Sequence, residues 1–141
     1  FYVDVGAHHP VRFSNTSLFY KRGWCGLNID AMPDSMKKFE QLRPRDINVE
    51  CGVAGQAGKL LYHRFNEPAL NTFNATEAEH KNKPPYHILD TVEVAVDRLD
   101  ALLDRHMPAG QKIDFMSVDV EGKDEEVLQS NDWNRYRPRF R

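Results

Sequence analysis

Residues 113–122 read Ile113-Asp-Phe-Met-Ser-Val-Asp-Val-Glu-Gly122, an apolar and β-branched run that closes with two acids and a glycine. A short apolar run that ends in a turn residue predicts a buried strand entering a tight turn. Residues 1–6, Phe1-Tyr-Val-Asp-Val-Gly6, show the same pattern at the start of the chain. Two such strands, each followed by helix signals, indicate an α/β fold with polar side chains at the strand ends.

Strand and helix patterns alternate along the whole chain. We expect strands at residues 24–29, 47–53, 59–65, 91–96 and 113–120, and helices that begin near Ser14 or Asn15, Pro33, Asp97 and Asp124. In the helix after Pro33, we expect Met36, Phe39 and Leu42 to face the core. Residues 66–90 show neither the helical nor the strand periodicity of apolar residues, which predicts a mobile loop or a functional excursion. The alternation predicts a mostly parallel sheet covered by helices on both faces.

The composition is typical of a soluble globular domain. The chain has 141 residues, 19 Lys+Arg, 21 Asp+Glu and a formal net charge of −2. This balance gives no electrostatic reason to expect nucleic acid or a membrane surface as a partner. No apolar run approaches the ~18 residues that cross a bilayer, and no signal peptide is recognisable, so we expect a cytoplasmic protein.

The ends and the cysteines add two expectations. The chain starts on Phe1 without a Met and stops on Arg141 without a helix stop signal, so we expect residues 1–141 to be one domain that is incomplete at both ends. Cys25 and Cys51 would lie several residues apart on neighbouring parallel strands, which predicts two reduced thiols and no disulfide.

Ligands of open parallel sheets bind outside the carboxyl ends of the strands, where the strand order reverses. We therefore expect the residues at these strand ends to form one site. They are Asp4, Gly6, Ala7, His8, His9, Asp30, Ala31, Gly52, Val53, Asp119, Glu121 and Gly122.

Gly6 and Asp30 together indicate a nucleoside ligand. Glycine lets the backbone turn closely under a ligand, and Asp30 follows where a nucleotide-binding sheet places an acid against ribose hydroxyls. A dinucleotide needs further glycines for its pyrophosphate, but Ala7, His8 and His9 follow Gly6. The site therefore has one glycine, one acidic residue for the ribose hydroxyls and acidic surroundings for an ammonium group. This combination favours S-adenosylmethionine over NAD.

The sequence also resembles the FkbM family of S-adenosylmethionine-dependent methyltransferases. The matching stretches are residues 2–10, 12–16, 23–24, 28–31, 43–44, 46–48, 71–73, 113–122 and 130–133. The resemblance implies a Rossmann-like class I methyltransferase fold, a three-layer sandwich, with Asp4 to His8 around the methionine portion and Asp30 on the ribose. It also implies O-methylation of hydroxyls on sugars, glycans and natural products. The family fold has seven strands, whereas this chain stops on entering the fifth.

Methyl transfer is an in-line displacement, so the protein must hold the acceptor oxygen about 3 to 3.5 Å from the methyl carbon. A base that takes the hydroxyl proton contributes roughly 10²- to 10⁴-fold. We expect Asp119 and Glu121 to supply this base, with His8 as a further candidate. An acid at this strand end could also hold a divalent cation, although the visible sequence supplies no second ligand.

Asn71, Thr72 and Phe73 interrupt the polar stretch with groups that can hydrogen-bond and stack, so we assign them to the substrate, a small molecule or glycan. A linker could carry the same residues. The sequence gives no indication of the oligomeric state.

Several site residues also have a purely structural interpretation. Asp4 could satisfy backbone groups of the turn, Asp30 could cap the following helix, and His8 and His9 could be ordinary loop residues. Glu121 could simply open the next helix. Two other functions remain open at this point: an NAD-binding Rossmann oxidoreductase, and a non-catalytic remnant that keeps the cofactor sheet.

Overall fold

Four parallel strands form the central sheet of the computed structural model, which describes residues 1–140. The strands are β1 (Tyr2–Val5), β2 (Gly26–Asp30), β3 (Ile47–Glu50) and β7 (Phe115–Val118). Their order is β3-β2-β1-β7, and every pairing is parallel. The order reverses at β1, because β2 and β3 lie on one side of it and β7 on the other. The predicted parallel sheet is confirmed.

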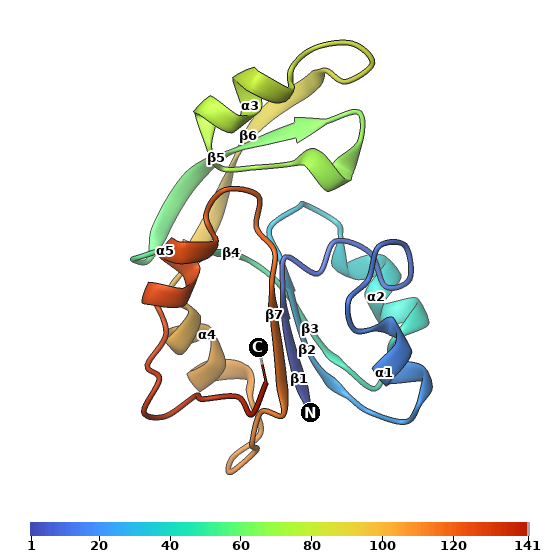
Figure 1. Cartoon of the computed structure of the whole chain (residues 1–141), viewed down its shortest axis with the longest axis vertical. Coiled ribbons are helices and arrows are strands. Elements are labelled where there is room, and N and C mark those ends of the chain that lie inside the picture. The colour runs from blue at the N-terminus through green and yellow to red at the C-terminus, as the bar shows by residue number, and fades with distance from the viewer. Residues whose placement is uncertain (141) are drawn as a thin grey trace.

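Helices cover both faces of this sheet, as the three-layer prediction requires (Figure 1). They are α1 (Ser17–Lys21) and α2 (Met36–Leu42) on one face, and α4 (Leu99–His106) and α5 (Asp124–Gln129) on the other. Side chains along a strand alternate between the two faces of the sheet. The residues at alternate positions differ in polarity here, so the two faces of the sheet differ as well.

The main hydrophobic core lies between the sheet and the α4–α5 layer. Val3 and Val5 of β1 pack there with Leu99, Leu102 and Leu103 of α4. On β1 and β2, the intervening positions include Asp4 and Asn28, which are also buried but polar. The α1–α2 side therefore holds a buried polar network beside a small apolar cluster, and Asp4 joins this network to the carboxyl end of β1.

A second sheet follows β3 and stands over the carboxyl end of the parallel sheet (Figure 1). It contains β4 (Gly52–Val53), β5 (Gly58–Phe65) and β6 (Ile88–Asp97), in the order β4-β6-β5. β5 and β6 form a long antiparallel ribbon, and β4 pairs in parallel with β6. The single strand predicted at 47–53 is thus divided between two sheets, because the chain leaves the first sheet at Cys51.

Residues 66–90 are not the irregular stretch that the missing period predicted. They contain η1 (Pro68–Leu70), α3 (Ala75–Lys81) and the start of β6. The α3 helix starts with a side-chain cap, in which Asn74 Oδ1 accepts from the Glu77 amide at 3.1 Å. Only Ala78 of this helix is buried, so the helix lacks the apolar stripe by which sequence reveals a helix.

Two expectations for the helix after Pro33 are wrong. The helix begins at Met36, because Asp34 adopts a left-handed conformation (φ 68°) and interrupts the turn before it. Leu42 is 53% exposed. Met36 and Phe39 do face the sheet, but the next position on that face is taken by Arg43, and Leu42 is turned to solvent.

The structure also shows where the first helix begins, the state of the two cysteines and the end of the chain. The first helix begins at Ser17, where Ser14 Oγ accepts from the Ser17 amide at 3.0 Å. Cys25 and Cys51 are both free thiols, as predicted. Phe140 forms a parallel bridge with Phe115 of β7, so the segment after 133 does lead to a further strand position. Within residues 1–140, no helix is long and apolar enough to cross a membrane.

Candidate cofactor and active site

A cavity of about 260 Å³ opens at the carboxyl ends of β1, β2 and β7, beneath the second sheet. This is where the strand order reverses, the usual ligand position in a doubly wound sheet. The cavity brings together nearly all of the residues that the sequence assigned to a site. These are Asp4, Gly6, Ala7, His8, Asp30, Ala31, Gly52, Val53, Asn71, Phe73, Asp119 and Glu121. Thr72, His9 and Gly122 are not part of its wall.

Gly6 makes the sharp turn that opens the cavity. It has φ +78°, and a Cβ placed on it would lie 1.9 Å from the Asp119 carbonyl oxygen. Its amide donates to the Ile29 carbonyl at 2.9 Å, while the Asp119 amide donates to Val5 at 3.0 Å. The three strand ends are therefore drawn together at a point where only glycine fits.

His8 projects from this turn in a left-handed conformation (φ 61°). Its amide donates to Asp30 Oδ2 at 2.7 Å, which fixes the strained backbone. The imidazole stacks against Phe13, with ring centroids 6.3 Å apart. Its Nε2 is buried and has no hydrogen-bond partner among residues 1–140. By contrast, His9 Nδ1 accepts the amides of Val11 and Arg12 and stabilises its own loop.

Asp30 joins two backbone turns at the end of β2. Besides the His8 amide, it accepts the Met32 amide at 2.9 Å through Oδ1. Burial raises the pKa of Asp30, and the two backbone hydrogen bonds oppose this rise. The carboxylate thus organises the turns and lines the cavity at the same time. The helix-capping alternative does not apply, since Met32 precedes the helix.

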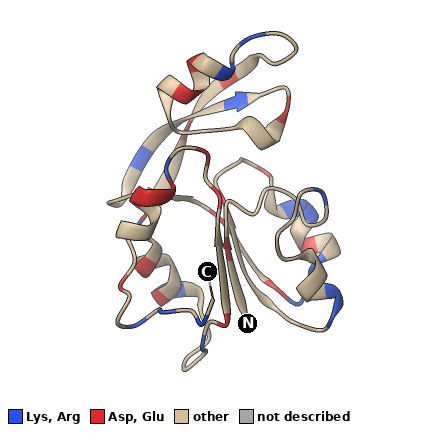
Figure 2. Ribbon diagram, in the orientation of Figure 1, with Lys and Arg blue, Asp and Glu red and all other residues tan. Residues whose placement is uncertain are grey.

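Asp4 and Asp119 are the other two acids at the cavity; Asp4 is buried, whereas Asp119 is exposed at the cavity wall. Burial raises the pKa of Asp4 to about 6, while the Thr16 hydroxyl, at 2.8 Å from Oδ2, and the charge of Arg43 act in the opposite direction. Burial also raises the pKa of Asp119, and the negative charges of Glu121 and Asp124 add to this effect. Figure 2 shows the acidic residues where β7 leads into α5. The cavity is therefore acidic on this side.

The second sheet closes the cavity from above. Phe73 and Tyr62 pack together with ring centroids 4.7 Å apart, and a Cβ on Gly52 would clash with the Phe73 ring at 2.7 Å. Asn71 Oδ1 accepts the Phe65 amide at 2.8 Å. The stretch assigned to the substrate thus reaches the cavity through Asn71 and Phe73.

Thr72 and Glu121 connect the two sheets. Thr72 Oγ1 donates to the Glu121 carbonyl at 2.8 Å, so its side chain binds the loop after β7 and stays out of the cavity. The Glu121 carboxylate forms an ion pair with Lys81 of α3, at 2.7 Å. Glu121 adopts φ 49° and is held at both its backbone and its side chain. It is less free to act as a base than Asp119.

Sequence reasoning missed part of the cavity wall. Phe13 and Asn15 lie in the loop after Gly6, and Tyr62 and Ala69 come from the second sheet and from η1. Phe13 and Asn15 stand within a stretch quoted for the family resemblance, so a signal for them existed. The sequence carried no such signal for Tyr62 and Ala69, because their position depends on how the β5–β6 ribbon folds back over the first sheet.

A metal centre does not emerge from the described residues. Within residues 1–140, no group of three or more His, Cys, Asp or Glu side chains could hold a metal ion.

The parallel sheet with its order reversal, the single-glycine turn and the buried acid at the end of β2 define a Rossmann-like domain of the kind that S-adenosylmethionine-dependent methyltransferases use. Residues 4–141 match the family model described as the Methyltransferase FkbM domain. The chain therefore belongs to the FkbM methyltransferase family, and S-adenosylmethionine is its methyl donor. No curated protein and no solved structure matches the chain. The family assignment decides against the NAD-dependent oxidoreductase and does not favour a non-catalytic remnant.

Proposed function

We propose that the cavity at the ends of β1, β2 and β7 is the S-adenosylmethionine site. The cofactor carries an ammonium group and two vicinal ribose hydroxyls, and buried carboxylates suit both. Asp30 would bind the ribose, and the turn from Gly6 to His8, with Asp4 and Asp119, would surround the methionine portion. Ala31, Gly52 and Val53 would complete the wall. The close approach permitted by Gly6 supports this fit.

We further propose that the methyl acceptor is a hydroxyl group of a sugar, a glycan or a related natural product. The observation that carries this proposal is His8, which lines the cavity and whose buried Nε2 has no hydrogen-bond partner among residues 1–140. A buried polar atom is normally hydrogen-bonded, so a ligand hydroxyl is a fitting partner for it. The bound cofactor supplies the electrophilic methyl group, and the chain has to orient and deprotonate the acceptor.

His8 and Asp119 are the groups that would take the hydroxyl proton. His8 lies close enough to Asp119 for its charge to lower the pKa of that carboxyl. Glu121 would stay bound to Lys81 and shape the entrance. Asn71 and Phe73 would contact the acceptor from above, and Thr72 would hold the β7 loop in place.

The acceptor class is tested by incubating the full-length protein with methyl-labelled cofactor and a panel of hydroxylated sugars and glycans. Mass spectrometry should show the addition of one methyl group to an oxygen. The panel also includes matched amines and carboxylic acids as acceptors. Methylation of these alone would overturn the hydroxyl proposal.

The role of His8 is tested by His8→Asn. Asparagine tolerates the left-handed backbone of this position, so the turn should persist. We expect kcat to fall about 10²- to 10⁴-fold, with S-adenosylhomocysteine binding changed far less. His9→Asn is the matched control, because an asparagine oxygen can accept the same backbone amides outside the cavity. Equal kcat values for the two variants would remove His8 from the proposal.

A further inference from the structure

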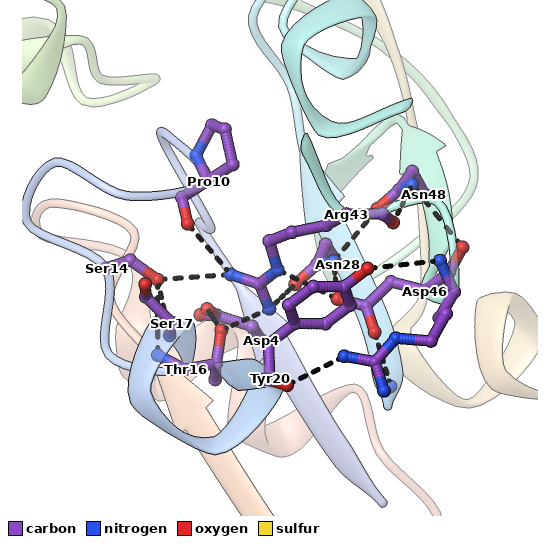
Figure 3. A network of polar contacts seen from close by, with 12 residues as sticks. Asp4, Pro10, Ser14, Thr16, Ser17, Tyr20, Asn28, Arg43, Asp46 and Asn48 are labelled. Carbon is purple, nitrogen blue, oxygen red and sulfur yellow. Dashed lines mark hydrogen bonds and ion pairs between the residues drawn. The ribbon is translucent and has the colours of Figure 1, made fainter. Parts of the chain in front are cut away.

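Arg43 is a fully buried arginine on the α1–α2 side of the sheet, directly after α2. It is 2% exposed, and its guanidinium lies within 5.4 Å of the ring centroids of Tyr2, Tyr20 and Phe39. Figure 3 shows it at the centre of a network that extends from Asp4 and the loop at Pro10 to Asp46. Arg43 does not line the cavity, and the methyl-transfer proposal above gives it no role.

The charge of Arg43 is balanced on the side away from the cavity. Its Nε donates to Asp46 Oδ2 at 2.9 Å. Asp46 also accepts from the Tyr2 hydroxyl at 2.7 Å, the Gly26 amide at 2.9 Å and the Asn28 side chain at 2.8 Å. A buried ion pair is tolerated when its remaining hydrogen-bonding atoms are satisfied, and this one meets that condition.

The other two nitrogens of the guanidinium bind the loop that follows Gly6, and Nη2 also donates to the Tyr2 hydroxyl at 2.8 Å and to Asn28 Oδ1 at 3.3 Å. Nη1 donates to the Pro10 carbonyl at 3.3 Å and to Ser14 Oγ at 3.2 Å. Nη2 donates to Thr16 Oγ1 at 2.8 Å, and that hydroxyl in turn donates to Asp4 Oδ2 at 2.8 Å. A chain of three groups therefore runs from Arg43 to a carboxylate in the cavity wall.

We propose that Arg43 is a positioning residue for the cofactor site: it holds the Pro10–Thr16 loop and, through the Thr16 hydroxyl, fixes the Asp4 carboxylate at the cavity. A planar guanidinium can bind Asp46, the loop and Thr16 at once in a fixed fork, which a lysine ammonium cannot do. The hydroxyl of Thr16 accepts from a cation and donates to an anion, an arrangement that strengthens both hydrogen bonds. The proposal rests on the cofactor site described above and goes beyond it.

This network also sets the electrostatics at Asp4. Burial has the largest effect on the pKa of this carboxyl and raises it; the Thr16 hydroxyl and the Arg43 charge lower the pKa, and the charges of Asp30 and Asp119 raise it. Loss of either stabilising group should therefore shift the protonation of Asp4 to higher pH. A carboxylate that attracts the cofactor's ammonium group loses this attraction when it is protonated.

The test is calorimetric binding of S-adenosylhomocysteine to the full-length protein between pH 5 and pH 8. Thr16→Val keeps the shape of the side chain and removes the hydroxyl. We expect it to weaken binding about tenfold, the effect of losing roughly one hydrogen bond to a charged group. The acid limb of its pH profile should move to higher pH. Thr16→Ser, which restores the hydroxyl, should bind like the wild type.

Arg43→Lys provides a second measurement. It keeps the positive charge and loses the planar guanidinium fork, so we expect weaker binding of S-adenosylhomocysteine. The acid limb of the pH profile should move less than in Arg43→Gln. Arg45→Gln is the matched control, because this neighbouring arginine is exposed and its guanidinium binds the Tyr20 carbonyl and ring outside the network of Arg43. It should bind like the wild type.

Asp30→Ala separates a failure of this proposal from a failure of the proposed cofactor site. If Asp30→Ala weakens binding while Thr16→Val and Arg43→Lys leave both affinity and pH profile unchanged, the positioning role is overturned. If Asp30→Ala has no effect either, the cofactor lies elsewhere and both proposals fall.

Discussion

Four residues of the cavity wall adopt positive φ angles: Gly6 at 78°, His8 at 61°, Phe13 at 57° and Glu121 at 49°. Such conformations are costly for residues with a Cβ and persist only where the surroundings hold them. Asp30 holds His8, and Thr72 and Lys81 hold Glu121. The strain is thus concentrated at the proposed site, where it brings strand ends close together.

Gly6→Ala should abolish S-adenosylhomocysteine binding. The new Cβ would lie 1.9 Å from the Asp119 carbonyl, a backbone atom that cannot rotate away, so β1 and β7 must separate. Gly23→Ala is the control, since Gly23 also has a positive φ (94°) but has open space around it. It should cost only about 1 kcal/mol of stability and leave binding intact. Binding by Gly6→Ala at wild-type affinity, measured by calorimetry, would contradict the close approach.

Asp4→Asn should increase stability while it weakens cofactor binding. Burial raises the pKa of Asp4 from 3.8 to about 6, so the folded protein binds the proton more tightly than the unfolded chain. Stability is therefore lost as the pH rises from about 4 through 6, and the ionised carboxylate carries this cost at pH 7.5. We expect a gain of about 1 to 3 kcal/mol for Asp4→Asn at pH 7.5 and little change at pH 4. Denaturant titrations at both pH values test this, and an equal difference at both would contradict it.

Helix α4 supplies the largest share of helical side chains to the main core. Leu102 is 1% exposed, whereas Leu42 of α2 is 53% exposed. Leu102→Ala should lower the free energy of unfolding by about 2 to 5 kcal/mol, because it leaves a cavity. Leu42→Ala should change it by less than about 0.5 kcal/mol. Similar losses in both variants, measured by chemical denaturation, would mean that Leu42 packs after all.

The elements show why sequence reasoning succeeded in part. Parallel strands such as β1 and β7 are short, mostly apolar runs, and glycine or an acid marks their ends, so the sheet and the strand-end residues were predictable. Helix α3 was not, because only Ala78 is buried. Arg43 stands in a stretch quoted for the family resemblance, but its structural role was not predictable. It occupies a core-facing position of a helix turn where a hydrophobic residue is the normal expectation, and its partners are distributed over residues 2–46.

The second sheet adds a wall to the cavity that the parallel sheet alone does not provide. Phe73 and Asn71 reach the cavity from this wall, and Lys81 ties it to the loop after β7. This ribbon lies between β3 and β7 in the chain, where the strand order reverses. The molecule therefore combines a buried parallel sheet with a more exposed cover, and in the proposed function the acceptor would enter between them.

Hydrogen exchange should distinguish these two parts. The four residues of β1 are all buried between two parallel neighbours, while residues 89–91 of β6 are exposed. We therefore expect the β1 amides to exchange slowest, near the rate of global unfolding, and the outer β5–β6 ribbon to exchange faster through local opening. S-adenosylhomocysteine should slow exchange at residues 71–73 and leave α4 unchanged, because α4 lies below the cavity on the core side. Equal protection of ribbon and sheet, or a ligand effect confined to α4, would show instead that the cover and the sheet open as one unit.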